Sequence, residues 1–583
     1  MERRTNESSQ TWLIFGLVAL VVVCVCGVVA LLAGGELWDM IRGKTSNGGT
    51  IPQNATAADL TIAVSPGMAP TLTKIVEQFN AQGLKTDDGT VITLRTVTMV
   101  PEKMVEESLG QPSFQALAPD SSLWLSQIDR RWNETHATGE VEGNIIPIGY
   151  RRFSDPVRYA TSPIVIAAWE TVAREMGWPG RDIGWQDIQR KATEDPNFKW
   201  NHPSTGHASG LLATLAEFYA GAGLTRGLTA DAATAQSTLD YVRAVESTVR
   251  FYGEGEDVIV QRLSAEGRNF LDAFVTQEQV VIAWNQSQSG ERLIALYPAE
   301  GTLWADHPLA LLELGAEGEV PLTDNQRRTY RAFVNYLKST DVQRQLLSAG
   351  YRPADMGLQL GEGDSPFAVS DAVDWRQPQT TLQIPSESVV AVVQNVWWYT
   401  KRPTHVLLVV DTSGSMEEND KIDLTKVALS SFVDQIRGDR DQVGLIAFSS
   451  GVQTLRSLQP LSDSGHDDMQ QAIKALEARG NTSLIDGVWD AYTSLQLSND
   501  PEAINAIVVM TDGQENNSTH TMNELRQRFQ QAEGFQVVIF TIAFGADADE
   551  SVMKTMAEIG GGQFRRADET DIQELYKVIS TYF

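Results

Sequence analysis

The sequence predicts an α/β protein with one N-terminal membrane-spanning helix and two separate α/β bodies. Three observations lead to this prediction. An uncharged apolar run stands near the N-terminus, short apolar strands alternate with helical patterns through most of the remaining chain, and the last alternations form a doubly wound pattern. The 583 residues leave room for several domains.

Charge and cysteine content exclude several classes of protein. The chain has 46 Lys and Arg against 75 Asp and Glu, which gives a net charge of -29. We expect no nucleic-acid partner, because such partners require a basic surface. Both cysteines, Cys24 and Cys26, lie in the apolar run, so the folded part has no disulfide framework and no cysteine-rich zinc site.

Residues 12–34 are predicted to form a single transmembrane helix. No charged residue occurs from Ser8 to Gly35, and at about 1.5 Å per residue the run is long enough for a hydrocarbon core of roughly 30 Å. A cleaved signal peptide has a shorter apolar run and a small-residue cleavage site, which this sequence lacks after the run. We expect residues 1–11 to be a short cytoplasmic tail.

A linker, two bodies and a connecting segment follow the anchor. The linker is rich in Gly, Ser, Thr and Asn, and the connecting segment contains an apolar helical stretch that ends in two tryptophans. Their expected boundaries are residues 35–58 for the linker, 59–376 for the first body, 377–402 for the connecting segment and 403–583 for the second body.

The second body has the pattern of a parallel sheet covered by helices on both faces. Four apolar runs of strand length are separated by helical patterns. In such sheets, ligands bind beyond the carboxyl ends of the strands. The four expected strands are His405–Val410, Val443–Phe448, Ile504–Met510 and Gln536–Ile542.

Polar side chains stand at these strand ends or on loops that can reach them. Asp411, Ser413 and Ser415 follow the first strand, Asp512 follows the third, and Thr482 lies in a loop between helices. Every ligand atom they offer is an oxygen, which suits a hard divalent cation such as Mg²⁺. Hydroxyl ligands leave the ion under-neutralised, so an open coordination position would attract a carboxylate from a partner.

These five residues resemble the metal-ion-dependent adhesion site of the von Willebrand factor type A domain. The family's Asp-x-Ser-x-Ser motif stands at Asp411–Ser415, and its threonine and second aspartate match Thr482 and Asp512. The resemblance covers residues 403–583. It implies a Rossmann-like doubly wound fold that uses Mg²⁺, or Mn²⁺ or Ca²⁺, to bind a protein or surface ligand, and a domain that keeps the fold without metal is the alternative.

The first body also alternates strands with helices. Strands are expected at Asp59–Val64 and Ile164–Ala167, and an amphipathic helix at Pro70–Asn80. We also predict a strand at Val280–Trp284, because this run is short and continuously apolar. A strand at Leu309–Leu312 and helical segments over Asn325–Ser348 complete this body.

The order of these elements resembles the type 2 periplasmic solute-binding proteins of bacterial uptake systems. The resemblance implies two lobes joined by crossover strands, with a small solute held between them. By this analogy, four serines stand where hydroxyl groups and helix N-termini would grip an oxyanion or another polar solute, although helix capping is an equal alternative for each of them. These serines are Ser65, Ser122, Ser162 and Ser209.

The sequence shows no Gly-x-Ser-x-Gly elbow, Walker loop, His-Glu-x-x-His motif or catalytic cysteine, so we expect a binding protein and not an enzyme. The favoured interpretation is a single-pass protein of a bacterial plasma membrane whose outward-facing type A domain adheres to a partner. A solute receptor or sensor whose type A domain docks a partner is the main alternative. A chelatase-like accessory subunit and a scaffold without either function are weaker alternatives.

Overall fold

The computed structural model describes residues 59–583 except residues 137–150, 155, 254, 288–289, 316–317, 462, 499, 501, 533–534 and 581. The predicted tail, transmembrane helix and linker therefore lie outside the described residues. Within the described ranges, no helix combines the length and the apolar character that membrane crossing requires.

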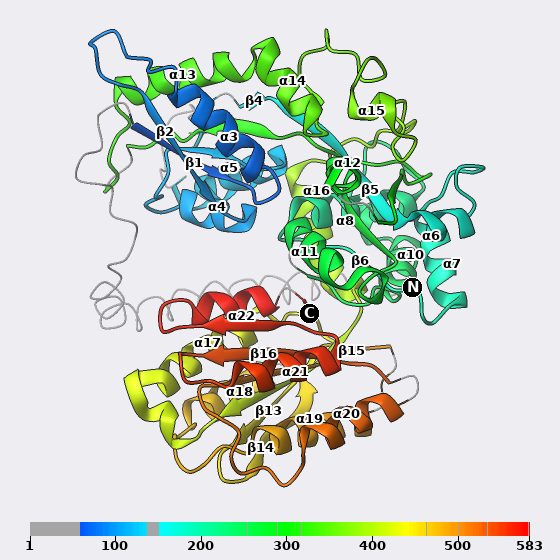
Figure 1. Ribbon diagram of the computed structural model, residues 1–583, viewed down its shortest axis with the longest axis vertical. Helices are drawn as coiled ribbons and strands as arrows, with labels where there is room; N and C mark the ends of the chain where they lie inside the picture. The colour runs from blue at the N-terminus through cyan, green and yellow to red at the C-terminus, as the bar shows by residue number, and fades with distance from the viewer. Residues whose placement is uncertain are drawn as a thin grey trace, which may run out of the picture. The chain divides into compact units, whose positions relative to one another are not determined.

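The C-terminal body is built on a six-stranded sheet with the order β14-β13-β12-β15-β16-β17 (Figure 1). Neighbouring strands are parallel except β14, which runs antiparallel to β13. The chain order reverses between β12 and β15, which makes their carboxyl ends the topological switch point of the sheet. The strands are β12 (Thr404–Asp411), β13 (Gln442–Phe448), β14 (Val452–Pro460), β15 (Ile504–Thr511), β16 (Val537–Phe544) and β17 (Phe564–Ala567).

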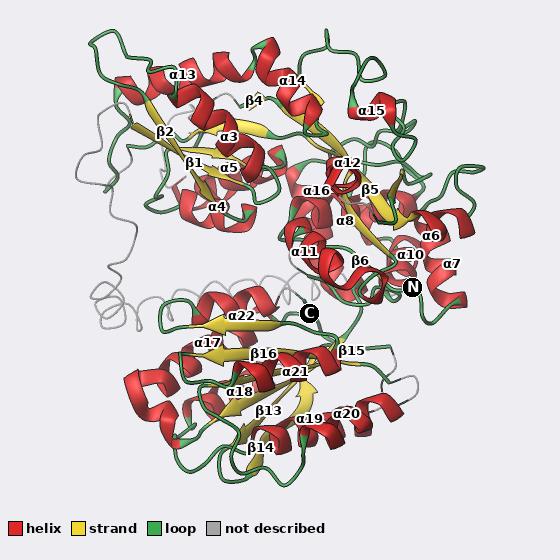
Figure 2. Ribbon diagram, in the orientation of Figure 1, coloured by secondary structure: helices red, strands yellow, loops and turns green. Residues whose placement is uncertain are grey.

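Helices cover both faces of this sheet (Figure 2). All eight residues of β12 are buried; Val406, Leu408 and Val410 share a core with one set of helices, while Leu407 and Val409 share another core with the second set. This two-sided burial explains why the strand reads as a continuous apolar run. The first set is α17 (Lys421–Gln435), α18 (Asp463–Lys474) and α22 (Ile572–Ser580), and the second is α19 (Leu484–Ser498), α20 (Met522–Gln531) and α21 (Glu550–Gly560).

Local sequence signals start two of these helices. Thr521 and Glu524 form a capping box at α20, in which each side chain accepts a hydrogen bond from the backbone N–H of the other. Asp549 caps α21 by accepting a hydrogen bond of 3.1 Å from the N–H of Val552.

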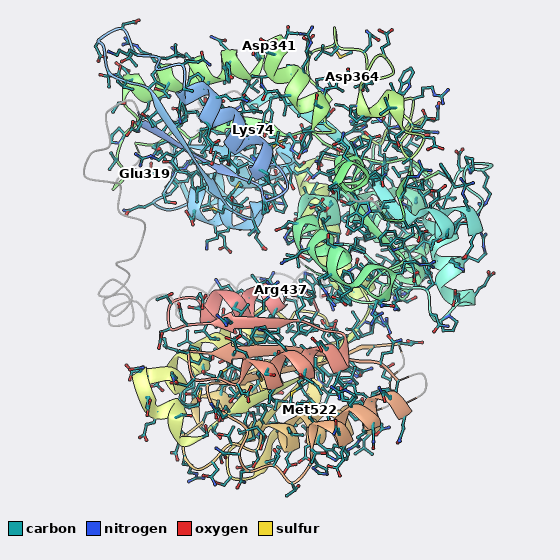
Figure 3. The ribbon with its side chains drawn as sticks, viewed as in Figure 1. Lys74, Glu319, Asp341, Asp364, Arg437 and Met522 are labelled. Carbon is teal, nitrogen blue, oxygen red and sulfur yellow. The ribbon has the colours of Figure 1, made fainter. Side chains whose placement is uncertain are left out.

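The first lobe of the N-terminal body has a sheet with the order β2-β1-β3-β10-β4. Helix α3 (Ala69–Asn80) buries its predicted apolar face there, and the Phe79 ring lies 5.3 Å from the Phe333 ring of α13. Exposed charges lie on the outer faces of the helices of this lobe, such as Lys74 on α3 and Asp341 on α14 (Thr340–Ser348) (Figure 3). The strands are β1 (Asp59–Val64), β2 (Thr93–Thr98), β3 (Ala116–Ala118), β4 (Val157–Arg158) and β10 (Pro308–Leu311); the other helices are α4 (Pro101–Ser108), α5 (Ser122–His136), α13 (Asp324–Leu337) and α14 (Thr340–Ser348).

The second lobe is organised around β5 (Ala160–Trp169), in a sheet with the order β11-β5-β7-β6 to which β8 and β9 add through β5. The other strands are β6 (Trp200–Asn201), β7 (Ala273–Gln277), β8 (Leu293–Leu296), β9 (Trp304–Ala305) and β11 (Arg352–Pro353). The helices are α6 (Glu170–Glu175), α7 (Trp185–Glu194), α8 (Ala208–Ala222), α9 (Ala230–Thr234), α10 (Gln236–Glu246), α11 (Glu256–Glu266), α12 (Glu278–Ser287) and α15 (Pro366–Val369), followed by α16 (Glu387–Thr400) of the connecting segment.

The chain crosses between these two sheets at adjacent points. One crossover is Tyr159, between β4 and β5, and another is Asp306–His307, between β9 and β10. The N–H of Tyr159 donates to the carbonyl of His307 over 3.3 Å, and the N–H of His307 donates to the carbonyl of Asp120 over 3.2 Å. Two sheets joined by such crossovers agree with the expected two-lobed arrangement.

The α/β fold class is confirmed, but one predicted strand is wrong. Val280–Trp284 lies in helix α12, and the strand of this region is β7, which ends directly before that helix. Four of the five predicted residues are buried in the helix, so the run looks continuously apolar in either conformation. The prediction also missed β14, because the residues of this edge strand are half-buried or exposed and show no apolar run.

Candidate metal centre and interlobe cluster

The candidate metal centre lies at the switch point of the C-terminal sheet. Asp411 is the last residue of β12, and Asp512 directly follows β15. These strands are parallel neighbours, with Val410 opposite Met510. The sheet therefore brings two carboxylates, which are far apart in the sequence, to one edge.

The turn after β12 adds two hydroxyl groups. The N–H of Ser413 donates to Asp411 Oδ1 over 2.7 Å, which orients that carboxylate. Ser413 Oγ and Ser415 Oγ are 3.2 Å apart, and Ser415 Oγ donates to Asp512 Oδ1 over 2.7 Å. The hydroxyl of Ser415 thus joins the ends of β12 and β15.

Thr482 completes the predicted set from the loop before α19. Its N–H donates to Asn516 Oδ1 over 3.0 Å, and its carbonyl accepts from the N–H of Asn516 over 3.2 Å. A Cβ atom placed on Gly513 would lie 3.3 Å from Thr482 Oγ1, 3.5 Å from Ser415 Oγ and 4.0 Å from Asp411 Oδ2. The side chains of all five predicted residues therefore gather around one small space.

Both carboxylates of this centre are fully buried, whereas Ser415 is half-buried and the neighbouring Gly414 is exposed. Burial raises the pKa of Asp411 to about 6; hydrogen bonds from Thr511 and Ser413 oppose this rise, and the charge of Asp512 adds to it. Two carboxylates and three hydroxyls form an all-oxygen set that fits a hard divalent cation, which would offset this concentration of negative charge.

Two further residues belong to the centre, and the sequence analysis missed both. Lys421, the first residue of α17, donates from Nζ to Asp512 Oδ2 over 2.6 Å. Thr511 Oγ1 donates to Asp411 Oδ2. A lysine in the first turn of a helix faces the positive end of the helix dipole, so its position was a usable signal for a nearby anion.

The four serines proposed for solute binding have different surroundings. Ser65 is buried directly after β1, and Ser209 is buried in the first turn of α8. Ser162 Oγ accepts from the N–H of Gln279 over 3.1 Å, at the start of α12. Ser122 begins α5, and its N–H donates to Asp306 Oδ1 over 2.7 Å.

Two buried acidic residues stand beside Ser65 and Ser209. Asp120 follows β3 in the first lobe, and Glu256 begins α11 in the second; we name these four residues the interlobe cluster. Burial raises the pKa of Asp120 to about 7, and the charge of Glu256 adds to the rise, so the two carboxyl groups interact across the lobes. Asp120 Oδ1 and Glu256 Oε1 have no hydrogen-bond partner of standard geometry among the described residues.

The C-terminal body is a doubly wound sheet with an all-oxygen centre at its switch point, and the N-terminal body has two lobes joined by crossover strands. Residues 405–578 match the family described as von Willebrand factor type A domain. Residues 60–352 match the family described as Bacterial extracellular solute-binding protein. Because the second match covers half of the chain, the protein belongs to that solute-binding family, and it carries a type A domain in addition.

Curated relatives share a limited part of the chain. Calcium-activated chloride channel regulator 1 of Bos taurus is 25% identical over 185 residues, which is 32% of this chain and 19% of that protein. Inter-alpha-trypsin inhibitor heavy chain H3 of Mesocricetus auratus is 27% identical over 173 residues, which is 29% of this chain and 19% of that protein. The chain thus spans about a fifth of the length of these relatives.

Solved structures resemble parts of this chain at low identity. The sulfate-binding protein SubI from Mycobacterium tuberculosis H37Rv is 16% identical, with a TM-score of 0.35, over 52% of this chain and 88% of that chain. A von Willebrand factor type A protein from Catenulispora acidiphila is 19% identical, with a TM-score of 0.28, over 31% of this chain and 43% of that chain.

Proposed function

We propose that the type A domain binds a protein or surface ligand through a divalent cation held by Asp411, Ser413, Ser415, Thr482 and Asp512. The observation that carries this proposal is the convergence of these five oxygen-bearing side chains at the switch point. Mg²⁺ is the expected ion, and Mn²⁺ or Ca²⁺ are possible replacements because they also accept oxygen ligands.

The bound cation would supply an electrophilic site for a carboxylate oxygen of the partner. The protein's own residues orient the ligands: the N–H of Ser413 and the hydroxyl of Thr511 hold Asp411, and Asn516 holds the backbone of Thr482. The half-buried Ser415 places the centre at the surface, where a partner can reach it. The hydroxyl ligands carry no charge and Lys421 already pairs with Asp512, so the ion would keep positive charge for the partner.

The proposal includes the predicted location and the absence of catalysis. Residues 12–34 would anchor the chain in a bacterial plasma membrane, with residues 1–11 inside and the linker and both bodies outside. The long uncharged apolar run and the match to an extracellular family support this arrangement. It also disfavours the chelatase-like alternative, because such a subunit works with an ATPase in the cytoplasm.

Magnesium binding tests the proposed centre directly. Isothermal titration of the full-length protein with Mg²⁺ should show one site that Asp411→Ala removes, while Asp423→Ala, which changes an exposed carboxylate on α17, should keep it. Equal Mg²⁺ uptake by wild type and Asp411→Ala would rule out the assigned ligands. Circular dichroism of both variants reports whether the fold is retained.

A solute receptor or sensor is the second candidate function, and the interlobe cluster favours it. Buried carboxyl oxygens without partners are costly unless a ligand supplies donors. The carboxyl oxygens of Asp120 and Glu256 offer hydrogen-bond acceptors, and burial disfavours any further negative charge beside them, which favours an amine or a polyol over the oxyanion expected from the serines alone.

Thermal-shift measurements on the full-length protein separate these solute classes. Amines or polyols should raise the unfolding temperature, and Asp120→Asn and Glu256→Gln should each remove this effect, whereas the exposed Glu77→Gln on α3 should not. Stabilisation by sulfate or another oxyanion would contradict the proposed solute class. A protein that responds to none of these compounds would favour the scaffold without a solute.

A further inference from the structure

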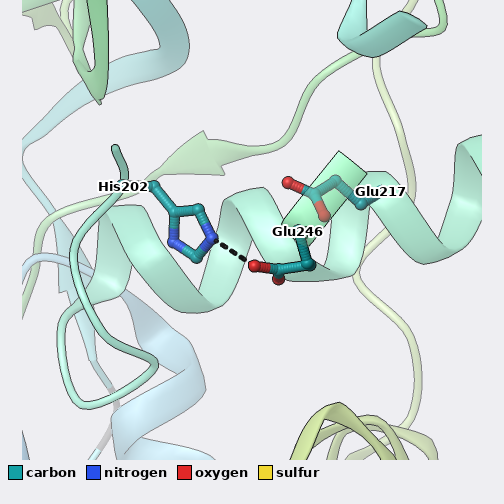
Figure 4. A group of neighbouring side chains, drawn as sticks. All are labelled: His202, Glu217 and Glu246. Atoms are coloured by element: carbon teal, nitrogen blue, oxygen red, sulfur yellow. Dashed lines mark hydrogen bonds and ion pairs between the residues drawn. The ribbon is translucent and has the colours of Figure 1, made fainter. Parts of the chain in front are cut away.

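A second group of metal-binding side chains lies in the second lobe of the solute-binding body, outside the type A domain. His202 follows β6, Glu217 lies in the middle of α8, and Glu246 ends α10. All three residues are completely buried, and one potential ligand atom from each lies within 4.8 Å of the other two. Figure 4 shows the imidazole and both carboxylates directed toward the same region.

The hydrogen bonds of His202 place a lone pair opposite a carboxylate. His202 Nδ1 lies 2.8 Å from the carbonyl oxygen of Pro203, which can only accept a hydrogen bond, so Nδ1 carries the proton. The Nε2 atom of the neutral imidazole is then an acceptor, yet it lies 3.2 Å from Glu246 Oε2. Two facing acceptors require a positive charge between or on them, from either a proton or a metal ion.

Glu217 adds a second carboxyl group whose charge and hydrogen-bonding capacity are not satisfied. Neither of its carboxylate oxygens has a hydrogen-bond partner among the described residues. Burial raises the pKa of Glu217 well above its ordinary value, and the charges of Glu246 and Glu300 raise it further. A fully buried carboxyl group without a partner is costly, and a ligand with positive charge at this position removes that cost.

Among the described residues, no lysine or arginine forms an ion pair with Glu217 or Glu246, although the charge of Lys401 acts on Glu246. Within the described part of the chain, His202 is the basic residue that pairs with Glu246. The nearby Lys401 forms its ion pair with Asp441, at 2.9 Å. With a neutral imidazole and two ionised glutamates, the cluster would carry two negative charges, which equals the charge of one divalent cation.

Neighbouring groups orient Glu246 through hydrogen bonds. Metal ligands in proteins are commonly held in place by hydrogen bonds of this kind. Trp397 Nε1 of α16 donates to Glu246 Oε1 over 2.6 Å, and Tyr252 Oη donates to Glu246 Oε2 over 2.8 Å. The carbonyl of Pro203 orients the imidazole in the same way. Carbonyl, indole and phenol partners of this kind fix ligand geometry in metal sites.

We propose that His202, Glu217 and Glu246 bind a first-row divalent metal ion such as Zn²⁺, in a site separate from the type A centre. Imidazole nitrogen and carboxylate oxygen are both zinc ligands, whereas a nitrogen ligand is unfavourable for Mg²⁺. Complete burial indicates a structural role: the ion would link α8 and α10 and, through Trp397, hold α16 of the connecting segment against them.

Zinc retention by the full-length protein tests this site independently of the type A centre. The protein is loaded with Zn²⁺, dialysed against EDTA to remove accessible ions, and analysed for zinc per chain. Wild type and Asp411→Ala should each retain one zinc ion, and Glu217→Gln should retain none. Failure of the type A proposal would leave this result unchanged, because Asp411 lies outside the cluster. Equal retention by wild type and Glu217→Gln, or no retention by wild type, would overturn the site.

Thermal unfolding provides a second measurement, which does not require that the bound zinc ion leave the protein slowly. Zn²⁺ should raise the unfolding temperature of the wild type but not of Glu217→Gln, whereas Mg²⁺ should have no effect that depends on Glu217. Without metal, Glu217→Gln should unfold at or above the wild-type temperature, since it removes an unpaired buried carboxyl group at nearly constant shape. If this variant does not fold, His202→Gln is measured in the same way, with Glu77→Gln as the control. An equal Zn²⁺ shift in wild type and variant would contradict the proposal.

Discussion

Lys421 Nζ donates a hydrogen bond of 2.6 Å to Asp512 Oδ2, which places a buried ammonium group beside the all-oxygen candidate metal centre. The other oxygen of the same carboxylate, Oδ1, accepts a hydrogen bond from Ser415. Lys421 therefore balances one of the two carboxylate charges of the centre. Its charge would also oppose a second cation at the same place, so we expect this ion pair to weaken metal binding at the proposed centre.

Lys421→Met should destabilise the metal-free protein and increase its response to Mg²⁺. Removing one partner of a buried ion pair leaves the carboxylate of Asp512 uncompensated, at a cost of about 3 kcal/mol. The divalent ion then meets less repulsion and restores more stability than in the wild type. The unfolding temperature of the type A domain, measured with and without Mg²⁺, reports both effects. Lys426→Met, which changes a more exposed pair on the same helix, should change neither value, and an unchanged Mg²⁺ response in Lys421→Met would refute the argument.

Thr511→Val should weaken metal binding without removing a ligand. The hydroxyl of Thr511 donates to Asp411 Oδ2 and accepts from the N–H of Gly513, so it orients the carboxylate. Loss of such an orienting group lowers metal affinity by about 10-fold or more. Isothermal titration with Mg²⁺ measures this loss. Thr541→Val on the adjacent strand β16 removes another buried hydroxyl, which donates to Met553 instead, and should leave the affinity unchanged.

Gly513→Ala should prevent metal binding at the proposed centre while preserving the fold. Its added Cβ would lie 3.3 Å from Thr482 Oγ1 and 3.5 Å from Ser415 Oγ, within the space that the five ligands surround. We expect Mg²⁺ titration to detect no binding to this variant, although its circular dichroism matches the wild type. Gly451→Ala is the control, because its Cβ would enter open space in the turn between β13 and β14. Normal Mg²⁺ binding by Gly513→Ala would show that the ion lies elsewhere.

His307 should make the stability of the solute-binding body depend on pH. Burial lowers the pKa of its imidazole to about 3, and Nε2 lies 2.7 Å from Gln277 Oε1. The folded state thus disfavours the protonated form, so the contribution of this residue to stability is present above pH 6.5. It is lost as the pH falls from 6.5 toward 3, at up to about 1.4 kcal/mol per pH unit.

Thermal unfolding of wild type and His307→Asn between pH 7 and pH 4 measures this contribution. Asparagine tolerates the positive φ of 32° at this crossover but does not titrate. The wild type should therefore lose more stability than the variant as the pH falls, even if the variant is less stable at pH 7. Parallel pH profiles for the two proteins would show that His307 is not responsible.

The polar residues at the strand ends were the part of the candidate metal centre that could best be predicted from the sequence. Asp411 and Asp512 each follow a buried apolar run, and a parallel sheet must bring such ends to one edge. Val280–Trp284 was mispredicted because a short apolar run has the same appearance in a buried helix and in a buried strand. Ser162 illustrates another limit of prediction from sequence. Its hydroxyl accepts a hydrogen bond from the backbone N–H of Gln279, and no local sequence pattern predicts this distant contact.

The order of apolar runs, helical periods and oxygen-bearing residues determined the α/β class and the five candidate ligands, because each of these signals lies within a few neighbouring residues. Only the tertiary structure decided which distant side chains meet. Lys421 reaches Asp512 across 91 positions, and Thr511 reaches Asp411 across 100. The cluster of His202, Glu217 and Glu246 likewise joins a loop and two helices whose approach depends on packing of the whole lobe, and no local periodicity specifies that packing.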